Sequence, residues 1–168
     1  VEETYRLKYL SEELTEDTRI SGVARLKLKA KLDNNVGILS GMLVDFGRCK
    51  RPTLELEDID GEFLNLGLNG GNMPYKKFKL GDETDYRVIT RESINVQNRR
   101  NIYNKDEVII GGEYDFEIDL EPMDYTLLKG HRLGLIIYST DIEMTEKPIQ
   151  LTNFQVDESS IELVLPIK

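Results

Sequence analysis

Apolar and polar side chains alternate with a period of two along much of the chain. Residues 24–32 place apolar side chains at every even position and basic ones at every odd position. Residues 114–120 repeat the pattern with acidic side chains at the odd positions, and residues 161–165 form a third such segment that ends before Pro166. Successive side chains of a strand point to opposite faces, so each segment predicts a half-buried strand.

Two further segments, residues 37–46 and 133–138, are largely apolar on both faces. Such runs fit central strands that are covered on both sides, although periodicity alone does not separate them from a buried helix. Their short length and nearby glycines favour strands. Residues 86–90 give a weaker strand signal.

Turn-forming residues separate these segments. Asn34–Asn35, Asp60–Gly61, the Asn-Gly-Gly-Asn run at 69–72 and Gly111–Gly112 all predict turns. Residues 48–79, rich in glycine and charge, are interpreted as an extended connection. No segment has a long, capped period of 3.6 residues, so helices are expected to be few and short.

Many short strands separated by turns predict an all-β domain, a β-sandwich or jelly roll, over residues 1–168. The strict alternation and the central apolar run together predict its core. The side chains expected to be buried are Ala24, Leu26, Leu28, Ala30, Tyr114, Phe116, Ile118, Leu135 and Ile137.

The basic and acidic faces of the first two strands suggest a further hypothesis, that they are cross-strand neighbours. Opposite charges placed this way contribute roughly 0.2–1 kcal/mol each. Pairing order is not readable from sequence, so the hypothesis depends on the observed sheet. The residues concerned are Arg25, Lys27, Lys29 and Lys31 on one strand and Asp115, Glu117 and Asp119 on the other.

Composition fits one globular domain: of 168 residues, 39% are hydrophobic and 32% charged. The net charge of −9 argues against nucleic acid as the main partner, because phosphate binding needs a basic surface. The single cysteine, Cys49, excludes an internal disulfide framework and favours a reducing compartment. The longest apolar run is far short of the roughly 20 residues that cross a bilayer. A first residue of Val1 indicates a domain excised from a larger protein.

Residues for catalysis are scarce. His131 is the single histidine, at the entry to an apolar strand, where a structural role is the favoured interpretation. A Ser-His-Asp or Cys-His arrangement would need it as base. Ser40 lies one place late for a G-x-S-x-G nucleophile turn and falls inside a predicted strand. One histidine and one cysteine are too few for a zinc site, so no catalytic residue, metal or cofactor is predicted.

Clusters of charge and glycine also favour structural interpretations. The carboxylates Asp115, Glu117 and Asp119 on one face of a strand are interpreted as solvated or paired with lysines. The acidic run Glu55, Glu57, Asp58 and Asp60 does not follow the order of a calcium-binding loop. We interpret the acidic run as a solvated loop. The lysine cluster, formed by Lys76, Lys77 and Lys79, is interpreted as a solvated loop or edge. The glycines Gly67, Gly70 and Gly71 are not followed by the Lys-Ser or Lys-Thr of a phosphate-binding loop.

Three long segments carry a family resemblance. Residues 9–22 (YLSEELTEDTRISG), 114–125 (YDFEIDLEPMDY) and 128–141 (LKGHRLGLIIYSTD) resemble the C-terminal domain of bacterial X-prolyl dipeptidyl aminopeptidases. The Gly-His-Arg-Leu entry to the last strand is also similar to related ester and acyl hydrolases, including cocaine esterase. The resemblance covers nearly the whole chain. Glu13 departs from it, since many relatives have proline there.

The resemblance implies a jelly-roll sandwich, similar to galactose-binding domains, packed on an α/β-hydrolase catalytic domain. The larger protein would be a cytoplasmic serine peptidase that releases X-Pro dipeptides from peptide N-termini. Its Ser-Asp-His triad would lie upstream, so no catalytic position carries over to this chain. The leading function is then an accessory domain that shapes or stabilises the catalytic domain.

The alternative is an independent carbohydrate- or surface-binding module. Tryptophan, the best platform for stacking a sugar ring, is absent, and Tyr75 and Tyr103 would replace it weakly. A free-standing enzyme is disfavoured because the chain lacks a base and nucleophile pair.

Overall fold

The fold of this chain is all β, as predicted. The computed structural model describes residues 5–65, 72–139, 145 and 151–168. Within these ranges no helix has the length and apolar character needed to cross a membrane, and helix η2 is a three-residue 3-10 turn. The elements are β1 (Arg6–Leu10), β2 (Thr18–Gly22), β3 (Arg25–Leu32), β4 (Ile38–Asn65), β5 (Asn72–Asn95), η2 (Val96–Asn98), β6 (Glu113–Asp119), β7 (Met123–Leu127), β8 (Arg132–Ser139) and β9 (Phe154–Val164).

The chain divides into two compact units. We call Val1–Gly47 with Tyr86–Lys168 the sandwich unit, and Arg48–Asp85 the hairpin unit. Strands β4 and β5 each begin in one unit and end in the other. The expectation of a single domain over residues 1–168, like the jelly-roll connection order, stays a prediction.

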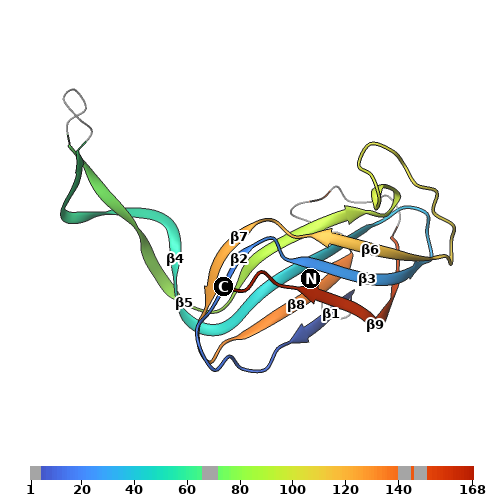
Figure 1. Cartoon of the computed structure of the whole chain (residues 1–168), viewed down its shortest axis with the longest axis horizontal. Helices are drawn as coiled ribbons and strands as arrows, with labels where there is room; N and C mark the ends of the chain where they lie inside the picture. Colours follow the sequence, from blue (N-terminus) through green and yellow to red (C-terminus); the bar gives the residue numbers. More distant parts are fainter. Residues whose placement is uncertain (1–4, 66–71, 140–144, 146–150) are drawn as a thin grey trace. The chain divides into compact units, whose positions relative to one another are not determined.

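Antiparallel sheets form the sandwich unit (Figure 1). One has the strand order β1-β8-β4-β5, a second β6-β3-β9, and β2 pairs with β7. β4 and β8 are inner strands that pair from Leu39 with Ser139 to Phe46 with Arg132. Val44, Ile136 and Tyr138 are buried in a cluster separate from the main core. The doubly apolar segments are therefore central strands, as predicted.

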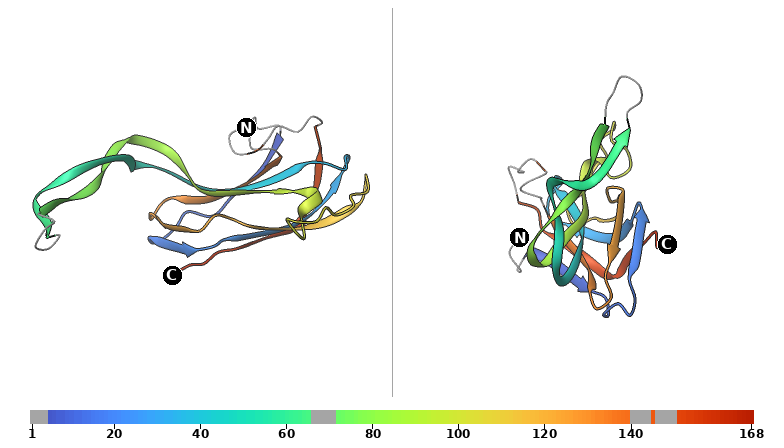
Figure 2. Two further views of the ribbon diagram at one scale, coloured as in Figure 1. Left: turned by 90° about the horizontal axis from the view of Figure 1, so that it is seen from above. Right: turned by 90° about the vertical axis from the view of Figure 1, so that its left-hand side faces the viewer.

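The main core lies between the layers of strands seen in Figure 2. It joins side chains of β3 and β6 to side chains of β4 and β8. The layers approach closely at Gly41, where a Cβ would lie 2.8 Å from Leu26 Cδ2. Eight of the nine predicted core side chains are buried.

Tyr114 is the exception, and it is half-buried. Its hydroxyl accepts a hydrogen bond from the backbone N–H of Ile109 at 2.7 Å, and the guanidinium of Arg99 lies 4.3 Å from its ring centroid. A phenol needs a polar partner when its ring is packed, so this side chain sits at the edge of the core.

The hairpin unit corrects two predictions. Residues 48–79 are not an extended connection, because they lie in the long strands β4 and β5, apart from residues 66–71. Asp60–Gly61 is not a turn but lies within β4, where Gly61 has a φ of 78°. A glycine with positive φ inside a strand is typical of a bulge. Most of the predicted turn at 69–72 lies outside the described residues, whereas Asn34–Asn35 and Gly111 lie in turns or bends as predicted.

Candidate functional site

His131 belongs to a buried polar cluster in the sandwich unit. Its Nδ1 lies 2.7 Å from Asp45 Oδ1, and the Tyr125 hydroxyl donates to Asp45 Oδ2 at 2.8 Å. His131 is 7% exposed and Asp45 only 1%. A carboxylate only accepts hydrogen bonds, so Nδ1 carries the proton in this pair. The cluster ties β4 and β7 to the residue that precedes β8, which is a structural role.

Gly47 makes room for the imidazole of His131. A Cβ at this position would lie 2.2 Å from His131 Cδ2 and Cγ, well inside van der Waals contact. His131 was a candidate from the sequence, whereas Asp45 and Tyr125 were missed. The available signal was Asp45 itself, the one charged residue in the apolar run 37–46.

Ser40 and Cys49, the possible nucleophiles, are not joined to the imidazole. Ser40 is fully buried in β4, inside a strand as predicted, and its Oγ lies 2.8 Å from Ser93 Oγ. Cys49 is a half-buried free thiol in the hairpin unit. Among the described residues, no group of three or more histidine, cysteine, aspartate or glutamate side chains could hold a metal ion.

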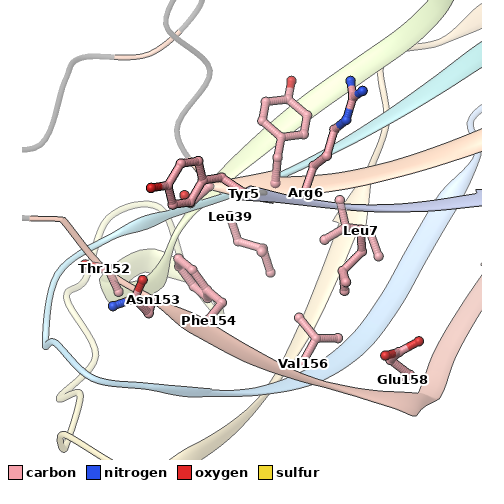
Figure 3. Close-up of a pocket in the computed structure, with 12 residues that line it drawn as sticks. Tyr5, Arg6, Leu7, Leu39, Thr152, Asn153, Phe154, Val156 and Glu158 are labelled. Carbon is pink, nitrogen blue, oxygen red and sulfur yellow. The ribbon is translucent and has the colours of Figure 1, made fainter. Parts of the chain in front are cut away.

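A hollow of about 240 Å³ opens in the sandwich unit between β1, β8 and β9. Figure 3 shows Leu7 and Leu39 pointing toward Phe154 and Val156 across it. Its volume is below the roughly 300–1,000 Å³ of typical small-molecule sites. The side-chain amide of Asn153, at its margin, already donates to Asp33.

Glu158, also at this hollow, is engaged by a neighbouring phenol. The Tyr9 hydroxyl donates to Glu158 Oε2 at 2.9 Å. Burial, followed by this hydrogen bond and the charge of Glu158, raises the pKa of Tyr9 to about 12. Tyr9 therefore stays protonated near neutral pH and is unsuited to act as a general base there.

The acidic face of β6 lies beside the basic face of β3, which confirms the cross-strand hypothesis. The register pairs Arg25 with Asp119, and the pairing continues to Lys31 opposite Glu113. Arg25 Nε and Nη2 donate to the two carboxylate oxygens of Asp119 at 2.5 and 3.0 Å. This hydrogen bonding, aided by the positive charge, lowers the pKa of Asp119. The carboxylates of β6 serve as ion-pair partners in the sheet.

The Arg25–Asp119 pair predicts an acid-sensitive contribution to stability. A carboxyl pKa that is lowered by folding stabilises the fold above its unfolded value, near 4, and this contribution is lost as the pH falls through the folded value. When the pH is lowered below 5, the Tm of Asp119→Asn should therefore fall less than the Tm of the wild type. The measurement is Tm against pH for the wild type and the variant.

Arg25→Gln provides the matched control. It should shift the Tm–pH curve in the same direction as Asp119→Asn, and the double variant should add little. Independent, additive effects of the two substitutions would contradict a shared origin in this pair.

One face of the hairpin unit is occupied by ion pairs. Lys79 Nζ lies 3.1 Å from Glu55 Oε2, and Lys77 Nζ lies 3.2 Å from Glu57 Oε1. Lys76 pairs with Asp58 at 2.9 Å on the other side of the two strands. The acidic run was predicted to be a loop, and this was wrong: it is part of β4. The lysine cluster faces it from β5.

The opposite face of the hairpin unit carries four apolar side chains beside the Asp58–Lys76 pair. Leu54 and Leu56 alternate with Glu55 and Glu57, and Phe78 and Leu80 alternate with the paired lysines. Successive side chains point to opposite sides, so these four share one face. We call Leu54, Leu56, Phe78 and Leu80 the apolar hairpin face; their exposed fractions are 94%, 52%, 56% and 65%.

Comparisons with known proteins place the chain in a family. Residues 1–165 match the family described as the X-Pro dipeptidyl-peptidase C-terminal non-catalytic domain. The Xaa-Pro dipeptidyl-peptidase of Ligilactobacillus salivarius is 38% identical over 99% of the chain, and that of Lactiplantibacillus plantarum 35% over 98%. The matched regions are 21% and 20% of those proteins, so the chain spans about one fifth of their length.

A solved structure shares the fold. An α-amino acid ester hydrolase matches 99% of the chain with a TM-score of 0.63 at 16% identity, over 26% of its own length. The profile match over nearly every residue agrees with the resemblance carried by the sequence. This chain belongs to the family of X-Pro dipeptidyl-peptidase C-terminal non-catalytic domains.

Proposed function

We propose that this chain is the accessory domain of a longer Xaa-Pro dipeptidyl-peptidase, and that it packs on and stabilises an α/β-hydrolase domain of that polypeptide. The observation that carries the proposal is the family match over residues 1–165, by a chain only about one fifth as long as its relatives. The peptide substrate would bind and react in the hydrolase domain. The polypeptide would reside in the cytoplasm, where a domain whose one cysteine is Cys49 needs no disulfide.

The described side chains are consistent with this division of labour. His131 is held by Asp45 inside the sandwich unit, and neither Ser40 nor Cys49 is bonded to it. The hollow beside β1 is small and lined by neither Tyr75 nor Tyr103. No particular observation favours the alternative of a carbohydrate-binding module.

Deleting this chain from the intact polypeptide tests the proposal. We expect a lower Tm and lower solubility, because apolar surface covered by the accessory domain becomes exposed. The triad of the hydrolase should still act on an X-Pro chromogenic substrate in the fraction that stays folded. The measurements are thermal unfolding, soluble yield, and activity per titrated active site.

The purified 168-residue chain is the companion sample and should hydrolyse none of that substrate. A truncated polypeptide with unchanged Tm, solubility and substrate range would contradict the accessory role. Activity of the isolated chain would contradict the proposal that this chain is non-catalytic.

A further inference from the structure

The apolar hairpin face is an exposed surface that the accessory role does not by itself explain. Leu54 is 94% exposed in a strand whose neighbours Glu55 and Glu57 are paired with lysines. An isolated two-stranded hairpin is marginally stable in water, and contiguous exposed apolar side chains mark interaction sites. Burying this face would stabilise the hairpin and remove the apolar surface from water.

The charges of the hairpin unit indicate the chemistry of what covers it. Glu55 and Glu57 on the opposite face are neutralised by Lys79 and Lys77. Asp58 and Lys76, which alternate with these pairs and so lie on the apolar side, neutralise each other at 2.9 Å. These ion pairs leave the four apolar side chains as the main feature of this stretch of the face, so a complementary surface would be largely apolar.

The size of the face argues for a tethered partner. Four partly exposed side chains offer on the order of 400 Å² of apolar area. Two copies joined through this face would bury about 800 Å², below the roughly 1,200 Å² of a specific interface between separate proteins. A partner on the same polypeptide needs less area, because the covalent link supplies a high effective concentration.

We propose that the apolar hairpin face docks on an apolar patch of the α/β-hydrolase part of the same polypeptide, an inference that rests on the proposed function. The hairpin unit then acts as a clamp: Leu54, Leu56, Phe78 and Leu80 hold the hydrolase, and the ion-paired face stays toward solvent. The roughly four fifths of the relatives' length that this chain does not span provides the docking partner.

Site-specific photo-crosslinking in the intact polypeptide tests the docking. Benzoylphenylalanine is placed at Leu54 or at Leu80 on the apolar face, and at Glu57 on the opposite face as the matched control. We expect crosslinks from both apolar positions to peptides of the hydrolase part, in a product of monomer mass. The yield from Glu57 should be several-fold lower.

Each other result overturns the docking. A product of twice the monomer mass would identify a second copy as the occupant. A crosslink to residues 5–47 or 86–168 would show that the hairpin covers its own sandwich unit. Yields from Leu54 and Leu80 no higher than from Glu57 would mean that the face meets nothing.

A pair of double variants gives a second, independent measurement. Leu54→Asp with Phe78→Asp should lower the Tm of the hydrolase part of the intact polypeptide. The charge swap Glu57→Lys with Lys77→Glu should leave that Tm unchanged. If both double variants behave like the wild type while deletion of the whole chain still lowers the Tm, the docking face is wrong and the accessory role stands.

Discussion

Replacing Asp45 by alanine should destabilise the sandwich unit by about 3–5 kcal/mol, because it removes the acceptor shared by one buried and one half-buried donor. Those donors are His131 Nδ1 and the Tyr125 hydroxyl, at 2.7 and 2.8 Å from the carboxylate. For a chain of this length the change corresponds to a fall in Tm of roughly 10 °C. Urea and thermal unfolding followed by circular dichroism would measure it.

Two milder variants calibrate this expectation. Tyr125→Phe removes one donor and keeps the His131 contact, so it should cost about 1 kcal/mol. Asp115→Ala removes an exposed carboxylate 3.8 Å from Lys29 Nζ and should change stability by less than about 0.5 kcal/mol. If Asp45→Ala cost no more than Asp115→Ala, the cluster would not stabilise the fold.

Adding a single methyl group at Gly47 should be almost as damaging, at about 3 kcal/mol or more. Overpacking usually costs about 1–3 kcal/mol. Here the new Cβ would lie 2.2 Å from the ring of His131, so the ring must also move from its place beside Asp45. Gly130→Ala is the comparison. Gly130 has a φ of 82°, and a Cβ added there would have no neighbouring atom within 4 Å, so only backbone strain of about 1–2 kcal/mol applies.

A double-mutant cycle separates the steric cause from others. In a His131→Ala background the ring is gone, and Gly47→Ala should cost less than about 1 kcal/mol beyond the loss already caused by His131→Ala. The same cost of Gly47→Ala in both backgrounds would place the conflict elsewhere in the sheet.

Strands β3 and β6 of the sandwich core were predictable because one face of each is buried and the other faces solvent. Leu26 and Leu28 alternate with lysines, and Phe116 and Ile118 with carboxylates, so local pattern and burial agree. Tyr114 differed because its hydroxyl is bound by the backbone of Ile109, a contact that depends on the loop before β6.

The hairpin unit was misinterpreted for a physical reason. Leu54 and Leu56 alternate with acidic residues as in the other strands, but the dense charge of this segment and Gly61 indicated a loop. Pairing of its carboxylates with Lys76, Lys77 and Lys79 is a property of the strand register, which local pattern does not contain.

The buried cluster around His131 was out of reach for a similar reason. Asp45 and Tyr125 come from strands far apart in sequence, and periodicity says nothing about which strands meet. The lone acid in an apolar segment was a clue that a partner existed, but not which one.

The strand order has a consequence for synthesis of the chain. Arg6 in β1 pairs with Tyr138, 132 residues later, and Arg25 in β3 gains its first partner at Asp119 of β6, 94 residues later. At a translation rate of roughly 5–20 residues per second, the early strands wait on the order of ten seconds for their partners. During that time β3 is an unpaired strand with four buried-type side chains, a hazard for aggregation. The basic residues between them, at positions 25, 27, 29 and 31, interrupt every apolar pair and keep a waiting nascent strand from adding to another one.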